Sequence, residues 1–101
     1  ILGIRAVALP LACGNTVVLK ASETCPGVHA LIAQVFEEAG LPPGVVGVVT
    51  HAAEDAPAVV NALIGHKAVR RISFTGSTRV GRIIATECAR HLKPVLLELG
   101  G

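Results

Sequence analysis

The sequence predicts an α/β fold in which a parallel sheet carries helices on both faces. Short apolar runs rich in valine, leucine and isoleucine alternate with segments whose apolar residues recur at helical spacing. Most of the short runs are largely apolar, as expected of strands covered on both faces. No long linker, repeat or low-complexity tract interrupts them. The expected order is therefore strand, helix, strand, helix, strand, helix, strand.

The first half of the chain supplies two strands and the helix between them. Residues 1–13 could form the end of a preceding helix, which Pro10 would bend or break. "TVVLK" (16–20) and "VVGVVT" (45–50) predict buried strands. An apolar stripe over residues 28–39, followed by Gly40 as a cap, predicts the connecting helix.

The second half repeats the pattern. Asp55 opens a helix that ends near Gly65, and "VRRISF" (69–74) predicts a third strand. Apolar residues at helical spacing over 80–88 predict the next helix. "VLLEL" (95–99) predicts the last strand.

Composition indicates a segment of a larger protein. Of the 101 residues, 51% are hydrophobic and 16% charged, whereas about 25% charged is usual. A small domain buries less of its surface than a large one and needs more polar residues. We therefore expect the chain to be an internal piece of a longer protein.

Charge and cysteine usage exclude several classes of protein. The net charge is +2, and the only aromatic residues are Phe36 and Phe74, so neither a basic stripe nor a stacking platform for nucleic acid is present. No apolar run reaches the roughly 18 residues of a membrane span. Cys13, Cys25 and Cys88 form no CxxC motif, which favours buried structural thiols in a reducing, cytoplasmic compartment. The four histidines are dispersed, without metal-ligand spacing, and we expect them to be solvated.

Thr75-Gly76-Ser77-Thr78 marks a strand-to-helix junction suited to an anion. In such folds ligands bind at the carboxyl ends of the strands. Gly76 would let a ligand approach the backbone, and the hydroxyls and the amides at the helix start would bind a phosphate. An ordinary helix cap is the alternative. No G-x-G-x-x-G is present, and Arg82 stands where a P-loop requires lysine, so a nucleotide triphosphatase is disfavoured.

Lys20 ends the first predicted strand, and Glu23 lies three residues further on. One could donate to the hydroxyls of a ribose and the other accept from them, or both could simply be solvated.

Glu98 is an isolated carboxylate among apolar residues in "VLLELGG". Burial would raise its pKa towards neutrality, as a general base requires. A buried carboxylate bonded to backbone N–H groups is an equal alternative.

Four stretches together resemble the aldehyde dehydrogenase family. They are "LACGNTVVLKASE" (11–23), "EEAGLPPGVVGVV" (37–49), "FTGSTRVGR" (74–82) and "LKPVLLELGG" (92–101). The resemblance implies that residues 1–97 are part of a Rossmann-like NAD-binding domain and 98–101 the start of the catalytic domain. It also implies an oxidoreductase in which a cysteine thiolate attacks the aldehyde, NAD accepts hydride and a glutamate activates the hydrolytic water.

Site residues follow from matching positions in the family. Glu98 matches the general base, and Lys20 with Glu23 matches the pair that holds the adenosine ribose. The pyrophosphate and neighbouring cofactor contacts match Gly76, Ser77, Val80 and Leu99. Glu23 would repel a 2′-phosphate, which favours NAD over NADP.

Two departures from the family's pattern limit what the chain does alone. The nucleophilic cysteine lies beyond Gly101, so we expect the chain by itself to be inactive. "THAAEDAP" (50–57) replaces the Gly-rich turn of many members, and with "KASETCP" (20–26) it resembles enzymes of the salicylaldehyde or vanillin type. The whole enzyme would act on a small aldehyde and form a homo-oligomer.

Two alternative functions remain at the level of sequence. An acyl-phosphate reductase of related fold would use NADPH, but it needs no hydrolytic base, so Glu98 argues against it. A non-catalytic module that binds a nucleotide or assembles with partners is the second alternative.

Overall fold

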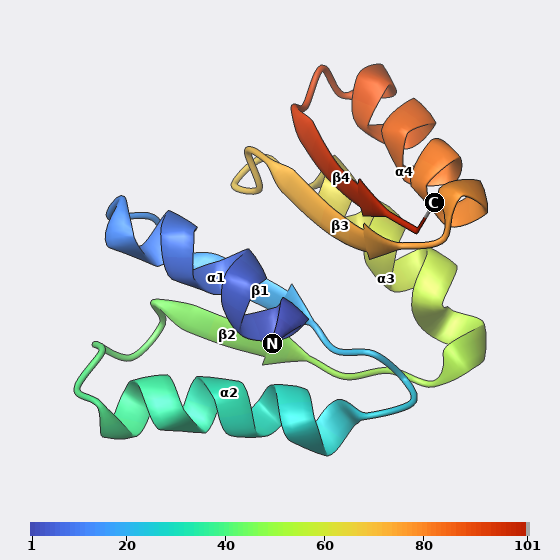
Figure 1. Ribbon diagram of the computed structural model, residues 1–101. Coiled ribbons are helices and arrows are strands. Elements are labelled where there is room, and N and C mark those ends of the chain that lie inside the picture. Colours follow the sequence, from blue (N-terminus) through green and yellow to red (C-terminus); the bar gives the residue numbers. More distant parts are fainter. Residues whose placement is uncertain (101) are drawn as a thin grey trace. The chain divides into compact units, whose positions relative to one another are not determined.

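A computed structural model describes residues Ile1–Gly100, and Gly101, the last residue of the predicted segment 98–101, lies outside this range. The chain divides into two compact units, the first spanning Ile1–Asp55 and the second beginning at Ala56. Each unit contains helices and one pair of parallel strands (Figure 1). The predicted α/β class and parallel pairing are thereby confirmed, with the sheet present as two parallel pairs.

The first unit contains α1 (Leu2–Ala12), β1 (Val17–Lys20), α2 (Pro26–Glu38) and β2 (Val46–Val49), followed by a short 3-10 turn, η1 (Ala53–Asp55). β1 and β2 run parallel, with Val17 opposite Val46 and Lys20 opposite Val49. α1 packs against β1 and α2 against β2. The two helices also meet at Gly3, where an added Cβ would lie 2.8 Å from Ile32 Cδ1.

The second unit contains α3 (Ala56–Gly65), β3 (Ile72–Gly76), α4 (Thr78–Arg90) and β4 (Val95–Leu99). β3 and β4 are parallel, with Ile72 opposite Val95 and Thr75 opposite Glu98. α4 packs against both strands. The third strand was predicted three residues too early, because Val69 belongs to the turn that follows α3, where its N–H donates to His66 O at 3.0 Å.

Pro10 lies inside α1, which continues to Ala12, so of the two expected effects the break does not occur. The proline falls in the last turn of the helix, where its missing N–H removes a single bond. Its carbonyl oxygen accepts hydrogen bonds from the Cys13 amide at 3.2 Å and the Asn15 amide at 3.0 Å. The side-chain amide of Asn15 donates to the same oxygen at 3.2 Å. The residues after the proline thus satisfy the end of the helix.

Three helices end in the same backbone motif, in which a residue of positive φ closes two reversed hydrogen bonds. That residue is Gly14 (φ 79°) after α1 and Gly40 (φ 93°) after α2, and the cap at Gly40 is the one that the sequence predicts. After α4 it is Leu92, with φ 51°. The Leu92 amide donates to Ala89 O at 3.1 Å, and the Lys93 amide donates to Cys88 O at 2.9 Å.

The core of the second unit is a small apolar cluster of Ile64, Ile84 and Cys88, against which side chains from α3, α4 and both strands pack. Lys93 fastens α3 to this unit, because its ammonium donates to the carbonyl oxygens of Ile64 and His66 at the end of that helix. Two of the three core side chains, Ile64 and Cys88, are fully buried.

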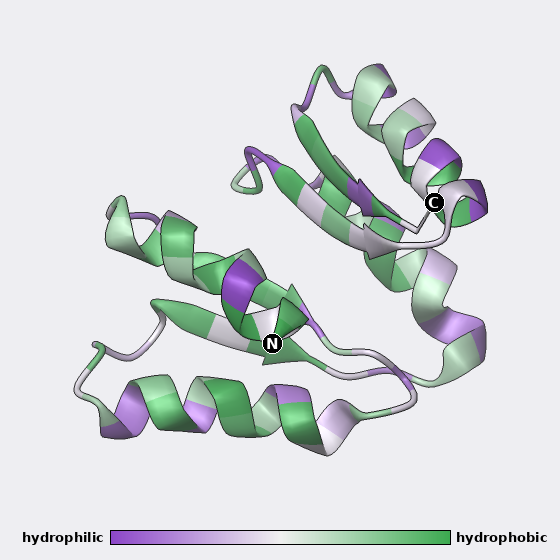
Figure 2. Cartoon of the chain, viewed as in Figure 1, coloured by the Kyte–Doolittle hydropathy of each residue, from purple (hydrophilic) through white to green (hydrophobic). Residues whose placement is uncertain are grey.

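Apolar side chains also remain in contact with solvent. Figure 2 shows hydrophobic colour along the strands and on much of the helical surface. On α2, three apolar side chains are more than half exposed: Val28 61%, Leu31 56% and Val35 54%. The low charged fraction of the sequence therefore corresponds to apolar surface that this chain leaves uncovered. In the described part of the chain, no helix has the length and apolar character that crossing a membrane requires.

Candidate cofactor site

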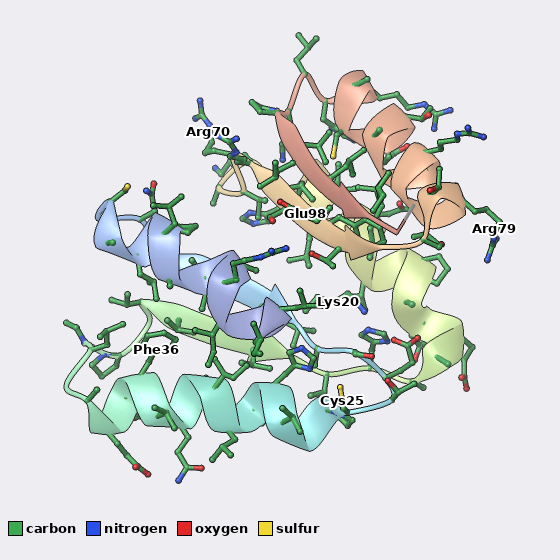
Figure 3. The ribbon with its side chains drawn as sticks, viewed as in Figure 1. Lys20, Cys25, Phe36, Arg70, Arg79 and Glu98 are labelled. Carbon is green, nitrogen blue, oxygen red and sulfur yellow. The ribbon has the colours of Figure 1, made fainter. Side chains whose placement is uncertain are left out.

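The first group of polar side chains lies where β1 and β2 end. Because the strands are parallel and Lys20 is opposite Val49, the residues that follow both strands emerge at the same edge. Lys20 is the last residue of β1, and its side chain extends from that end of the strand (Figure 3). Thr50 and His51 follow the end of β2.

The ammonium of Lys20 contacts three groups. It donates to Ala21 O at 3.0 Å and lies 2.6 Å from His51 Nε2. Glu23 Oε2 is 3.8 Å away, which completes an ion pair between partly exposed side chains. The lysine predicted as a ribose ligand is therefore held in a defined position beside the predicted acceptor.

His51 was expected to be solvated, and that expectation is wrong. It is partly buried, and its other ring nitrogen, Nδ1, lies 2.8 Å from Ala52 O. The sequence carries a signal for this contact, because Lys20 ends one of two paired strands and His51 closely follows the other. Only the register of the two strands shows that they meet.

Glu23 is exposed, and its pKa is lowered from the usual glutamate range. The main cause is a hydrogen bond from its own backbone N–H, and the nearby charge of Lys20 lowers the pKa further, while partial desolvation opposes both. The carboxylate is thus ionised at neutral pH and can accept hydrogen bonds from a ligand hydroxyl.

The second group lies at the start of α4. Ser77 is the N-cap: its Oγ accepts from the Val80 amide at 3.3 Å, and its carbonyl accepts from the Gly81 amide at 2.9 Å. The helix-cap alternative is therefore present. A serine that accepts through Oγ still has its hydroxyl hydrogen to donate, and an α-helix cannot satisfy the amides of Thr78 and Arg79 internally. The hydroxyl and these two amides are donors that an anion at this end of the helix could use.

Glycines in the second unit make close contacts. An added Cβ on Gly76 would lie 2.5 Å from Phe74 Cζ, so the ring leaves no room for a side chain. On Gly81 an added Cβ would lie 2.7 Å from Leu99 Cδ2, which brings Leu99 directly onto α4. The side chain of Val80 packs against the apolar core cluster. The cofactor roles assigned to Val80 and Leu99 stay predictions.

The end of β4 is tied to the start of α4. The Gly100 amide donates to Gly76 O, and the hydroxyl of Thr78 donates to Gly100 O, each at 3.4 Å. The glycine that follows the predicted base thus lies beside the predicted anion site.

Glu98 in β4 is opposite Thr75 in β3, and the side chain of Glu98 is exposed (Figure 3). Its expected burial is wrong in this chain. Side chains alternate between the two faces of a strand, and only Val95 and Leu97 of β4 are partly buried. The apolar neighbours that suggested burial therefore point to the other face or remain exposed themselves, as Leu96 does at 45%.

The cysteines differ in environment, although all were expected to be buried. Cys88 is buried, and burial raises the pKa of its thiol. Cys13 is exposed, and Cys25 is partly buried with its sulfur 3.8 Å from His29 Nδ1. Within Ile1–Gly100, no cluster of three histidine, cysteine or acidic side chains could hold a metal ion.

Comparison with known proteins identifies the family. The family model described as "Aldehyde dehydrogenase family" matches residues 1–101. A vanillin dehydrogenase from Pseudomonas sp. strain HR199 is 66% identical over 101 residues, which is 100% of this chain and 21% of that protein. The chain thus spans about a fifth of the length of the curated relatives it matches.

Solved structures of aldehyde dehydrogenases resemble this chain in fold and sequence. The crystal structure of a salicylaldehyde dehydrogenase from Pseudomonas putida G7, complexed with salicylaldehyde, superposes with a TM-score of 0.97 at 57% identity, covering 99% of this chain and 21% of that one. An aldehyde dehydrogenase from Mycobacterium tuberculosis complexed with NAD⁺ gives a TM-score of 0.87 at 38% identity, covering 99% and 20%. The fold, the family match and these likenesses agree: the chain belongs to the aldehyde dehydrogenase family.

Proposed function

We propose that this chain is the cofactor-binding part of an enzyme that oxidises an aldehyde, aromatic by preference, to a carboxylic acid with NAD. Residues 1–97 would belong to the NAD-binding domain and 98–101 to the start of the catalytic domain. The observation that carries the proposal is the cluster at the end of β1, where Lys20 lies between His51 and Glu23. Family membership and the names of the relatives, vanillin and salicylaldehyde dehydrogenase, support the substrate class.

The residues present fit the chemistry of NAD. An ammonium donor beside an ionised carboxylate suits a diol, which can accept from Lys20 and donate to Glu23. Ser77 with the first amides of α4 suits a pyrophosphate, since a helix start carries partial positive charge. Gly76, Val80 and Leu99 would complete the contacts around it. Bound NAD would supply the hydride acceptor.

Glu98 is the base that this chain contributes to the reaction. It would take a proton from the water that hydrolyses the acyl-enzyme. Its side chain is exposed in β4. The nucleophilic cysteine would be supplied outside these residues, so we propose that the chain alone has no dehydrogenase activity.

The setting of the whole enzyme is part of the proposal. The whole enzyme would act on a small aldehyde in the cytoplasm, where its cysteines would stay reduced. It would form a homo-oligomer.

The proposed ribose site can be tested in the full-length enzyme by titration with both cofactors. Lys20→Ala should weaken NAD binding by about 1.5–3 kcal/mol, the contribution of a charged hydrogen bond. Glu23→Gln should narrow the preference for NAD over NADP, because it removes repulsion of the 2′-phosphate. Lys67→Ala, at an exposed lysine in the turn after α3, is the matched control. Unchanged affinity in Lys20→Ala together with an unchanged preference in Glu23→Gln would exclude this site.

A further inference from the structure

We propose that His51 is a positioning residue that fixes the ammonium of Lys20 for the cofactor's ribose. The inference rests on the ribose-binding role proposed for Lys20. His51 acts through the lysine, and its effect is on the geometry of cofactor binding.

The hydrogen bonds of His51 determine its tautomer. Nδ1 lies 2.8 Å from Ala52 O, and a carbonyl oxygen can only accept, so Nδ1 carries the hydrogen. In the neutral ring Nε2 is then an acceptor, which matches the Lys20 ammonium 2.6 Å away. The two contacts require each other, because an imidazole that donates at Nδ1 presents its lone pair to the lysine.

The backbone fixes the carbonyl on which this arrangement depends. Ala52 O also accepts from the Asp55 amide at 3.0 Å, the hydrogen bond that closes the turn leading into η1. His51 is therefore held between the turn on one side and the end of β1 on the other. The parallel register of β1 and β2 brings the imidazole within reach of Lys20.

These contacts leave one N–H group of the Lys20 ammonium for a ligand. A lysine ammonium has three N–H groups on a flexible stem. Ala21 O and His51 Nε2 take two of them. That leaves one N–H, and Glu23 Oε2, 3.8 Å from the ammonium nitrogen, is too distant for a good hydrogen bond with it. A ribose hydroxyl placed there would accept from Lys20 and donate to Glu23.

Fixing the lysine before binding should improve affinity. Ordering a flexible side chain on binding costs free energy, and a pre-positioned one avoids that cost. We expect His51→Leu in the full-length enzyme to raise the Kd for NAD roughly 2- to 10-fold, the range that follows from ordering one side chain. The KM for NAD should rise in parallel, with kcat at saturating NAD unchanged.

The conservative variant separates positioning from packing. In His51→Gln, the amide oxygen can accept from Lys20, so the Kd should return close to the wild-type value. His51→Asn has the same amide on a shorter side chain, which falls short of Lys20, and should behave like His51→Leu. This pair gives the same comparison if the leucine variant does not fold. His66→Leu, at an exposed histidine whose ring accepts a hydrogen bond from the Ala68 amide of its own turn, is the control.

A double-variant cycle distinguishes failure of the inference from failure of the ribose site. If Lys20→Ala leaves the Kd unchanged, the ribose role itself is wrong, and this inference falls with it. If Lys20→Ala weakens binding but His51→Leu does not, only the inference is overturned. In the Lys20→Ala background, His51→Leu should have no further effect. An equal effect in both backgrounds would show that His51 does not act through the lysine.

Discussion

Glu98 combines an exposed carboxylate with a fixed backbone. The strand pairing holds the residue opposite Thr75. Two residues further on, the amide of Gly100 donates a hydrogen bond to Gly76 O. A base must reach a water molecule in a set direction, and these contacts set the direction of the Cα–Cβ bond. Position, more than burial, therefore qualifies this glutamate as the proposed base.

Glu98→Gln preserves shape and removes the basic oxygen. Steady-state turnover of the full-length enzyme should fall by about 10²–10⁴, the usual effect of losing a general base. Because hydride transfer precedes hydrolysis, a first-turnover burst of NADH should remain, measured by stopped-flow absorbance. Glu54→Gln, at an exposed glutamate in η1, should have no effect. Near-normal turnover in Glu98→Gln would assign the residue a structural role only.

Residue types and spacing were sufficient to single out Lys20, Glu23 and Ser77 as candidates. They could not show that His51 pairs with Lys20, because that contact depends on strand register between residues 31 positions apart. They also misjudged Glu98, since apolar neighbours along a strand do not determine which face is covered.

At the scale of elements, the ends of the helices carry the strongest local signals. Gly14 and Gly40 close α1 and α2 in the left-handed conformation that glycine adopts without strain. α4 closes in the same way on Leu92, whose side chain is 92% exposed. Leucine has a Cβ that disfavours this conformation, so the end of α4 is strained where the other two are relaxed.

Leu92→Gly should therefore stabilise the protein by up to about 1 kcal/mol, since little packing is lost and the positive φ is relieved. The thermal midpoint of the full-length enzyme measures the effect. The control is Leu9→Gly in α1, an equally apolar and 71% exposed residue with helical geometry, which should destabilise by roughly 0.8 kcal/mol. A lower midpoint for Leu92→Gly would mean that the exposed side chain makes a contact of its own.

The order of elements was predictable because periodicity in this chain is strong and glycines mark the helix ends. The interior proline and the late start of β3 were not, because both depend on hydrogen bonds between residues in the adjoining turns. Asn15 completes the turn after Pro10, and His66 O holds Val69 in the turn before β3.

At the scale of the whole molecule, the two units differ in how they are filled. Val7 and Ala21 are the buried apolar residues of the first unit, and Ile64, Ile84 and Cys88 those of the second. Burial raises the pKa of Cys88, with Lys93 opposing and Glu87 adding to the shift. The folded state thus holds this proton more tightly than the unfolded state. The contribution of the protonated Cys88 thiol to folding stability is therefore complete below the ordinary thiol pKa and is lost as the pH rises through the raised pKa.

Because Cys88 is buried, its thiol can serve as a probe for local opening of the second unit. A thiol with no exposed surface cannot be alkylated until its surroundings open, so its labelling rate reports how often that happens. Ile64→Ala removes a neighbour in the core and should cost about 2–5 kcal/mol, which would speed pulsed alkylation of Cys88 by about 30-fold or more. Val18→Ala, at a half-exposed position in β1, should leave the rate unchanged. The alkylation rate of Cys88, measured by peptide mass spectrometry, would then report how often the part of the chain that carries Ser77 and Glu98 opens.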